Sequence, residues 1–363
     1  MSFFDTCFRR PLFSRLLVCA LTVNFCLLFG GCATTTVSAR GTTADTIREQ
    51  RQQQAMALKA NWSRQDRLDD LSWHILKSGR ELCGKDVRNT MGFRFTSIDV
   101  IQNDYKDAAR LVYGLGDRPQ VVSITSDSPA DKAGLRVGDE FLSIDGTPVP
   151  TGRKSMNKLR KLITDSIESN VVKLEVARGG QSQTLHVAPE SVCRYPVTLF
   201  ADDRLNAFAD GNNVFITQGM MRFTGRDSEL QLVIAHEIAH NAEGHLTKSM
   251  GNRLLGGILD VAAAYYGVNT QGMFMDMAGQ AFSQAFEREA DYVGVYLLAR
   301  AGIDTSEAAD FWRRMAIEYP AAIKGTFAGS HPATAERYGN IEAAHREVME
   351  KSLAGEPLLP VRR

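Results

Sequence analysis

Residues 231–245 read QLVIAHEIAHNAEGH and contain three of the chain's seven histidines. His236 and His240 are four residues apart, so on an α-helix they lie about 40° apart, one turn along the same face. Both imidazoles can then bind one metal ion, and Glu237 can act on a water molecule beside that ion. This spacing is the HExxH pattern of zinc sites. The alternative is a buried helix with two hydrogen-bonded histidines and a surface glutamate.

A third ligand has to come from another part of the chain. The segment QAFSQAFEREADYVGVYLLARAG predicts a second helix with an apolar face, ended by Gly302. Glu287 and Asp291 lie one turn apart on it, and two carboxylates so placed repel each other unless a cation is near. Glu287 would complete a His2Glu set with one zinc position open for water. Asp291 would accept the Nδ1–H of a ligand histidine, expected to be His236. The alternative is a solvated acidic pair.

His245 is not expected to be the third ligand, and Glu289 is expected to point away from the site. At 100° per residue, His245 lies about 140° around the helix from His240, and it misses the HExxHxxGxxH spacing. We expect His245 to be structural and Glu289 to be solvated. The helix itself is expected to begin with a capping box of Ser228 and Gln231 and to end near Gly251.

Residues 81–193 have a different pattern. QVVSIT predicts a strand, SDSPADKAGL a turn and a short helix, RVGDEFLSIDG a strand between turns, and VVKLEVARGGQSQTLHVA a hairpin. These elements predict a small, mostly β domain. SPADKAGLRVGDEFLSIDG resembles the PDZ family, which implies binding of extended peptides at a sheet edge. Met91, Gly92, Phe93 and Phe95, in MGFRF, are the candidates for the peptide-binding loop.

The first 31 residues are predicted to be a signal peptide. Arg9, Arg10 and Arg15 precede an apolar run, LLVCALTVNFCLLF. GGCATTT follows and resembles the lipobox of bacterial lipoproteins, with Phe29 where leucine is usual. That resemblance implies lipidation of Cys32 and anchoring in the periplasm, at the outer membrane because no aspartate follows the cysteine. An ordinary cleaved signal or a short membrane anchor is the alternative.

Cys83 and Cys193 are the cysteines that remain beyond this segment. An even number in an exported chain predicts a disulfide, and two buried free thiols are the alternative. Such a disulfide would join the two ends of the β domain. Residues 32–80 between signal and β domain are predicted to be a tether followed by a helix whose apolar stripe includes Leu68 and Ile75.

Six further strings occur in a fixed order: NAFADG, VFITQGMM, HEIAHNAEGH, FEREADYVG, AGIDTSEAADF and SHPATAER. They resemble the zinc peptidase family that includes the CAAX prenyl protease, the heat-shock protease HtpX and periplasmic BepA-like enzymes. The resemblance implies a mainly helical, gluzincin-type domain with a small sheet at 194–350, one zinc ion per chain, and Glu287 as third ligand. It also implies a role for His331 near the zinc. His331 would either occupy the open zinc position or stabilise an oxyanion.

The whole chain is expected to be α+β: a PDZ domain at 81–193, a peptidase domain at 194–350, and a tail at 351–363. Lys+Arg and Asp+Glu both total 42, so no net charge favours nucleic acid as a partner. No stretch after the signal reaches the roughly 20 apolar residues of a membrane-spanning helix.

These patterns together predict a lipid-anchored periplasmic zinc endopeptidase that hydrolyses misfolded or misassembled envelope proteins. Its substrate is expected to lie extended along NAFA or VFIT. The alternative is a PDZ adaptor or a chaperone-like binding protein whose peptidase domain is idle. Peptides or partner proteins would bind the PDZ domain in either case.

Overall fold

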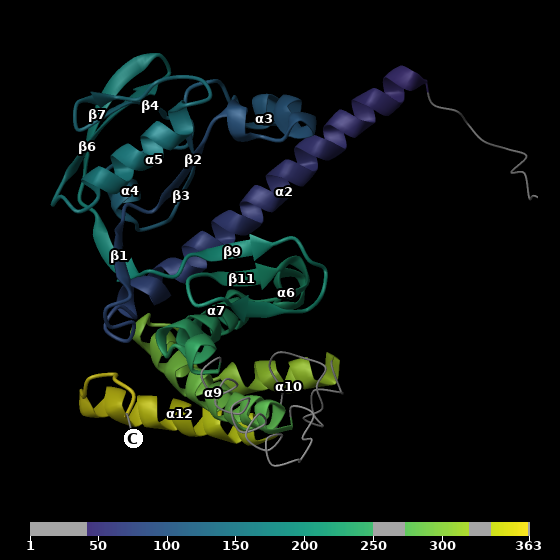
Figure 1. Ribbon diagram of the computed structural model, residues 1–363, viewed down its shortest axis with the longest axis vertical. Helices are drawn as coiled ribbons and strands as arrows, with labels where there is room; N and C mark the ends of the chain where they lie inside the picture. Colours follow the sequence, from purple (N-terminus) through teal and green to yellow (C-terminus); the bar gives the residue numbers. More distant parts are fainter. Residues whose placement is uncertain (1–41, 250–272, 319–334, 362–363) are drawn as a thin grey trace, which may run out of the picture. The chain divides into compact units, whose positions relative to one another are not determined.

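The computed structural model describes residues 42–249, 273–318 and 335–361, with residues 273–283 as backbone only. Cys32 and His331 lie outside the described residues, as does the C-terminal pair 362–363. The predicted α+β class is confirmed: along the chain, a long helix is followed by a mostly β domain and then by a mainly helical domain (Figure 1).

The N-terminal helix, α2, spans Thr43–Ser78. Its C-terminal half carries the predicted apolar stripe, because Leu68 and Ile75 are both fully buried. Trp73 and Leu76 are buried beside them, and all four belong to the hydrophobic core of the helical domain. This half of α2 is therefore part of the helical domain's core, although the β domain separates the two in sequence.

The mostly β domain contains an antiparallel sheet in the order β2-β3-β4-β6-β7, with β5 paired to β4. Alternate strand residues such as Val121, Phe141 and Leu174 fill its core, together with Leu159 from a helix. The predicted hairpin turn at Gly179 is present between β6 and β7. The elements are β2 (Phe93–Thr96), α3 (Lys106–Tyr113), β3 (Gln120–Ile124), α4 (Pro129–Lys132), β4 (Glu140–Ile144), β5 (Thr147–Pro148), α5 (Ser155–Ser166), β6 (Val172–Arg178) and β7 (Gln181–Val187).

A separate two-stranded ladder closes the β domain. Strand β1 (Val87–Thr90) pairs antiparallel with β8 (Glu190–Cys193), with Val87 opposite Cys193. Cys83 and Cys193 form a disulfide, with Cα atoms 5.7 Å apart and a sequence separation of 110. The chain thus leaves and re-enters the helical domain at neighbouring points.

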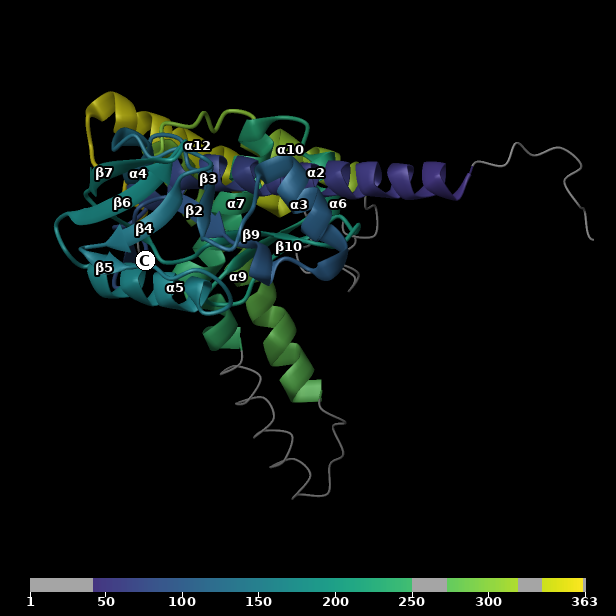
Figure 2. The same ribbon diagram turned by 90° about the horizontal axis from the view of Figure 1, so that it is seen from above.

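The helical domain combines a small sheet, in the order β10-β11-β9, with packed helices. Helix α7 packs along α9, and α9 packs along α12 (Figures 1 and 2). The inner face of the sheet contributes Val197, Ala207, Val214 and Ile216 to the same core. The elements are β9 (Val197–Phe200), β10 (Ala207–Ala209), β11 (Val214–Thr217), α6 (Gln218–Phe223), α7 (Asp227–Ala242), α9 (Met273–Arg300), α10 (Ala308–Glu318) and α12 (Ala335–Ala354).

The two edges of this small sheet differ. At the β9 edge, the side-chain amide of Gln65 on α2 donates to the Val197 carbonyl at 2.9 Å and accepts from the Leu199 amide at 2.8 Å. An outward-facing donor and acceptor of β9 are thereby satisfied. At the other edge lies β10, which pairs with β11 alone among the strands of the described residues.

Among the described residues, no helix combines the length and the apolar character needed to cross a bilayer.

Candidate metal centre

Helix α7 carries His236 and His240 inside the protein. The helix is apolar around most of its circumference, and Leu230, Val233 and Ile238 are buried in the domain core. Such a helix is stable as a central element surrounded by others. It therefore holds both histidines at fixed positions in the interior.

The start of α7 differs from the sequence prediction of a Ser228–Gln231 capping box. The helix begins at Asp227, and Glu229 accepts hydrogen bonds from the backbone amides of Gly225 and Arg226. The two oxygens of Glu229 also receive a forked pair of bonds from Arg314 on α10, at 2.6 and 2.7 Å. Burial would raise the pKa of Glu229, but Arg314 and Arg226 outweigh it and lower that pKa to about 2.

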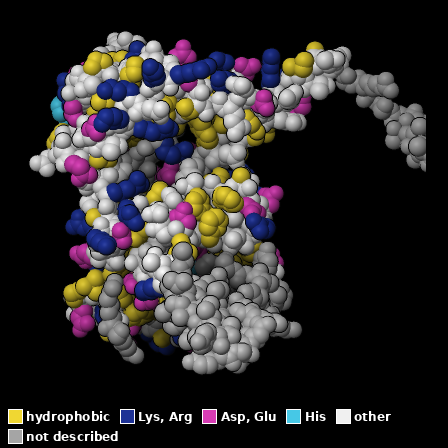
Figure 3. Space-filling view, in the orientation of Figure 1, with side chains coloured by type: hydrophobic (Ala, Val, Ile, Leu, Met, Phe, Trp, Pro, Cys, Tyr) yellow, Lys and Arg dark blue, Asp and Glu magenta, His cyan; other side chains and the backbone are white. Residues whose placement is uncertain are grey.

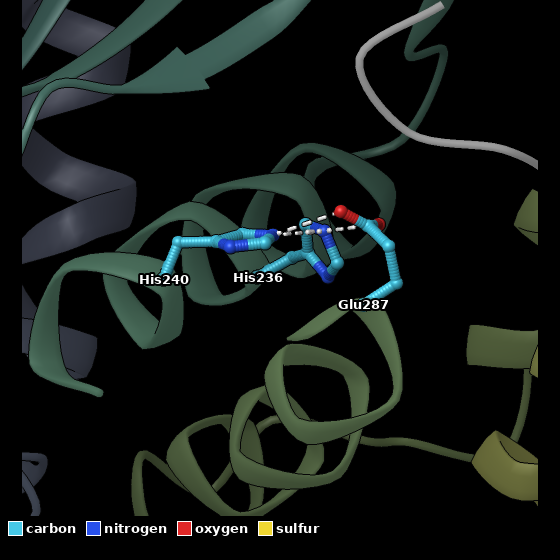
Figure 4. A group of neighbouring side chains, drawn as sticks. All are labelled: His236, His240 and Glu287. Atoms are coloured by element: carbon cyan, nitrogen blue, oxygen red, sulfur yellow. Dashed lines mark hydrogen bonds and ion pairs between the residues drawn. The ribbon is translucent and has the colours of Figure 1, made fainter. Parts of the chain in front are cut away.

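Donor atoms of three residues converge between α7 and α9. Nε2 of His236 lies 3.1 Å from Nε2 of His240. Nε2 of His236 lies 3.3 Å from Oε2 of Glu287, and Nε2 of His240 lies 3.3 Å from Oε1 of the same carboxylate (Figure 4). These three residues form the one group of metal-binding side chains found in the described residues. The sequence prediction brought together the same three.

The spacing of these donors fits zinc. Ligand atoms about 2.0–2.1 Å from a tetrahedral zinc ion are roughly 3.3–3.4 Å from one another. The two Nε2 atoms are 3.1 Å apart, and each lies 3.3 Å from one of the two oxygens of the Glu287 carboxylate, which is close to that value. Two neutral imidazoles and one carboxylate are also the ligand set of a catalytic zinc site with one open position.

A small residue brings the two helices together at this point. A Cβ atom on Gly294 of α9 would lie 3.4 Å from the backbone N and Cα of His236. That distance is at the lower limit of ordinary van der Waals contact, so a side chain longer than that of alanine would push α9 away from α7. Glycine at this position lets Glu287 reach both histidines.

Asp291 lies behind His236, as the sequence predicts. Its Oδ1 is 3.0 Å from Nδ1 of His236. Burial alone would lower the pKa of His236, but hydrogen bonds to Asp291 and Glu287 outweigh it and raise this pKa to about 9. A proton and a metal ion therefore compete for this imidazole at neutral pH.

Arg337, on α12, is a site residue that the sequence reading missed. It is buried, and its Nε and Nη2 each donate to Asp291 at 2.7 Å. Its Nη1 lies 3.1 Å from Oε2 of Glu287, and its guanidinium stacks 4.0 Å from the ring centroid of Trp312. Burial would raise the pKa of Asp291, but the charge of Arg337 holds it below its usual value. One guanidinium thus orients both acidic residues of the site.

His245 is not among the candidate ligands, as the sequence predicts, but it contacts one of them, and Glu289 is only partly exposed and contacts His245. Nδ1 of His245 lies 2.9 Å from Nδ1 of His240, and Nε2 of His245 lies 2.9 Å from Oε2 of Glu289. The projection of about 140° failed because α7 ends at Ala242, well before Gly251. Gly244 then takes a left-handed conformation with φ 65°, which redirects the chain toward His240.

One set of tautomers satisfies this whole chain of contacts. If Nε2 of His240 faces the metal, its Nδ1–H donates to Nδ1 of His245. His245 then carries its proton on Nε2 and donates to Glu289. Each candidate ligand histidine is therefore oriented by a carboxylate, directly for His236 and through a second imidazole for His240.

Glu237 follows His236 on α7 and is buried, with 2% of its surface exposed. A buried carboxylate beside a metal position is suited to accept a proton from a metal-bound water. Asn241, on the next turn, donates to the Asn213 carbonyl and accepts from the Gly211 amide. These bonds fix the β10–β11 turn to the helix that carries the histidines.

The predicted peptide-binding loop lies at the start of β2, the end strand of the larger sheet. Met91 is buried, and Gly92 has φ 76°, a conformation that favours glycine. Phe93 and Phe95 both pack near Phe141 in the domain core. The peptide-binding assignment stays a prediction.

Comparison with known protein families adds two assignments. Residues 90–188 match the PDZ domain model, and residues 177–345 match the model of peptidase family M48. Residues 177–345 thus resemble an M48 peptidase domain and are called the M48 domain below. The PDZ and zinc-peptidase resemblances inferred from sequence are thereby confirmed, and a zinc cofactor fits both the M48 domain and its His-His-Glu group.

Individual proteins resemble parts of the chain. The beta-barrel assembly-enhancing protease of Yersinia pestis is 33% identical over 134 residues, which are 32% of this chain and 27% of that protein. The mitochondrial metalloendopeptidase OMA1 of Schizosaccharomyces pombe is 30% identical, over 48% of this chain and 51% of its own length. A crystal structure of the HtrA3 PDZ domain bound to a phage-derived ligand aligns with 29% of this chain and 88% of its own, at 21% identity and a TM-score of 0.22. The chain therefore spans from about a quarter to half of these curated relatives.

Proposed function

We propose that this protein is a zinc-dependent endopeptidase. The observation that carries the proposal is the group of His236, His240 and Glu287, whose donor atoms are spaced as zinc ligands beside the buried Glu237. The orientation of both histidines by further partners supports it, because catalytic zinc sites are built in this way.

A zinc ion held by these residues would supply Lewis-acid chemistry to a peptide carbonyl and to a water molecule. The chain's own contribution is proton transfer and positioning. The Glu237 carboxylate accepts a proton from the attacking water and passes it to the nitrogen of the leaving amine. Asp291 and Arg337 keep His236 and Glu287 in place during that transfer.

The substrate is proposed to bind as an extended strand along β10. The sequence predicted that the substrate binds along one of two segments, NAFA or VFIT. VFIT is β11, the central strand of the sheet, and it is paired on both sides. NAFA contains β10, which has an outer edge to which a peptide strand can add. The structure therefore favours β10.

The decisive experiment compares Glu237→Gln with Glu287→Ala in the full chain. Because Glu237 handles protons and does not bind metal, Glu237→Gln should keep one zinc per chain and lose hydrolysis of an unfolded protein. Glu287→Ala should lose the zinc as well. Zinc is measured by plasma mass spectrometry, and hydrolysis by release of labelled peptides.

Two results would overturn the proposal. Full zinc occupancy in Glu287→Ala would remove the ligand assignment. A zinc-loaded wild-type chain that binds unfolded proteins without cutting them would instead support a PDZ adaptor or chaperone-like binding protein.

We also propose that the protein acts in the bacterial periplasm, anchored by a lipid on Cys32, and that its substrates are envelope proteins. The lipobox-like GGCATTT and the similarity to bacterial proteases named for beta-barrel assembly support this proposal. Cys32→Ser should move the protein from the membrane fraction to the soluble fraction. Equal membrane retention of Cys32→Ser and wild type would contradict it.

A further inference from the structure

Three aromatic rings cover the outer face of the small sheet, one from each strand. The ring centroids of Phe208 on β10 and Phe215 on β11 are 4.9 Å apart, and Phe200 on β9 lies 5.5 Å from Phe208 and 6.0 Å from Phe215. Phe200 is 41% exposed. Hydrophobic side chains gather over this sheet on the molecular surface (Figure 3). We call these three rings the aromatic face.

The aromatic face is unusual for its position. Ala207, Val214 and Ile216 point to the opposite, buried face of the same sheet. Since side chains alternate along a strand, the outer positions are those where a one-sided sheet ordinarily places polar residues. A cluster of one exposed and two half-buried aromatic rings instead marks a surface that contacts another molecule.

The backbone of β10 shows where an added strand would pair. The Asp210 amide donates to the Asn213 carbonyl, and the Thr217 amide donates to the Asn206 carbonyl, both at 3.2 Å. These bonds point toward β11. Because backbone groups alternate between the two sides of a strand, those of Ala207 and Ala209 point toward the outer edge. An antiparallel peptide bonded to both alanines has one residue directly opposite Phe208.

We propose that Phe208 selects substrates with an aromatic or large aliphatic side chain at the position opposite it. This inference rests on the proposed function and deepens it. In an antiparallel pair, directly opposite residues share a face, and a pair not joined by hydrogen bonds has the closer side chains. The substrate side chain opposite Phe208 would therefore extend the aromatic face by one further strand.

Charge at the strand ends favours a peptide over a lipid surface as the occupant. Asp203 and Asp210 are exposed near the two ends of β10. The arginines near them are already paired, Arg204 with Asp202 and Arg222 with Asp203. An anionic bilayer is attracted by clustered basic residues, whereas the two arginines named here are neutralised by aspartates and Asp210 adds a negative charge.

The test measures peptide binding without hydrolysis. Zinc-loaded Glu237→Gln is titrated with fluorescent octapeptides that differ in one residue, Phe or Ala, moved through each position in turn. The peptides have amidated C-termini, because PDZ domains capture free carboxylates. At one position, Phe should bind roughly 3- to 10-fold more tightly than Ala, as expected for an aromatic pair.

The preference should depend on the ring beside the edge. Phe208→Ala should reduce the ratio of Phe to Ala affinities to about one, while Phe208→Tyr should retain it. Phe200→Ala is the matched control: Phe200 is more exposed but lies two strands from the edge, so the ratio should remain. If Phe208→Ala does not fold, as judged by zinc content and thermal melting, Phe208→Val replaces it, since a β-branched residue favours a strand.

Two results overturn the inference: an unchanged ratio in Phe208→Ala or its replacement, or an equal loss in Phe200→Ala, which would indicate general hydrophobic adhesion. Hydrolysis by the unsubstituted chain is measured separately. Cleavage without the Phe208-dependent preference leaves the proposed function standing and removes this inference. The preference without cleavage removes the proposed function and leaves the binding surface.

Discussion

The two candidate ligand histidines are held by unequal partners. Behind His236, Asp291 and Arg337 are both buried and joined by two short bonds. Behind His240, His245 passes the contact to Glu289, whose side chain is 42% exposed. The partners of His236 are buried away from solvent, whereas the partners of His240 end at the surface in Glu289. Substitutions on the two sides should therefore differ in kind.

On the His240 side, we expect a loss of metal affinity with little loss of stability. His245→Gln removes the Nδ1 acceptor that fixes the tautomer of His240, and such changes weaken zinc binding by about 10- to 100-fold. Competition with a chelating dye measures the affinity. His74→Gln is the control, because His74 is half-exposed and lies on α2, outside the candidate ligand group; this variant should bind zinc as wild type does. Equal affinities for His245→Gln and wild type would contradict the orienting role.

On the His236 side, we expect a loss of stability as well. Arg337→Lys keeps the charge but loses the planar fork that bonds both oxygens of Asp291. A buried carboxylate deprived of its partner costs about 3–5 kcal/mol, so the thermal midpoint of Arg337→Lys should fall clearly. Calorimetry on metal-free and zinc-loaded protein measures this. Arg288→Lys is the control, because it changes an exposed pair with Glu336 and should leave the thermal midpoint unchanged. An equally small effect of Arg337→Lys would contradict the role of Arg337 in holding Asp291.

The sequence predicted those site residues that repeat at helical spacing. His236 with His240, and Glu287 with Asp291, are each four residues apart, so periodicity alone places each pair on one face. Arg337 comes from a third helix and has no such spacing. A chemical argument could have indicated a residue of this kind: Glu287 and Asp291 are buried on one helix face, and without a metal ion they need a positively charged side chain as a partner.

At the scale of elements, α7 is held at its N-terminus by Glu229. Its folded-state pKa of about 2 lies below the usual 4.5, so the carboxylate stabilises the fold fully above about pH 4.5. That contribution, roughly 3 kcal/mol, is lost as the pH falls toward 2. Urea unfolding of metal-free protein from pH 7 to 3 should show this loss.

Glu229→Gln should be less stable at pH 7 and depend less on pH over the same range. Glu307→Gln is the control, because Glu307 contacts the same Arg226 but is exposed. If Glu229→Gln and wild type lose stability in parallel between pH 5 and 3, the ion pair with Arg314 is not the cause.

Helix ends were the elements that sequence located least well. The spacing of apolar residues predicted α7 and α9, but the pattern continued past Ala242 and gave no sign of the break at Gly244. The residue types near Gly251 fitted a helix end as well as those near Ala242, where α7 ends. The actual stop depends on tertiary contacts, among them the pairing of His245 with His240 and Glu289.

At the scale of the whole molecule, the PDZ domain is inserted between α2 and the M48 domain. The order of the domains could be predicted from sequence, because each domain contains motifs typical of its own family. The contribution of α2 to the M48 core could not be predicted from sequence, because the apolar stripe that includes Leu68 and Ile75 can pack against any apolar surface. Pairing across more than a hundred residues leaves no periodic trace in sequence.

The disulfide at the base of this insertion should matter for stability. It closes a loop of 110 residues, which on the chain-entropy model contributes about 4–5 kcal/mol. The double variant Cys83→Ser, Cys193→Ser should therefore unfold at a lower urea concentration than oxidised wild type. Wild type unfolded with reductant should match the double variant. Coincident unfolding curves with and without reductant would contradict a structural disulfide.

The amide of Gln65 has a consequence for how molecules of this protein meet. An exposed strand edge is a template on which chains of any kind can pair, including other copies of the same protein. By imitating a peptide group at the β9 edge, the Gln65 side chain keeps the sheet from growing there. A sheet that can accept a strand at one edge alone can take up one extended chain, but it cannot link molecules into a continuous ribbon. An unfolded polypeptide that adds at β10, as proposed, would thus not meet a two-sided template on which it could polymerise.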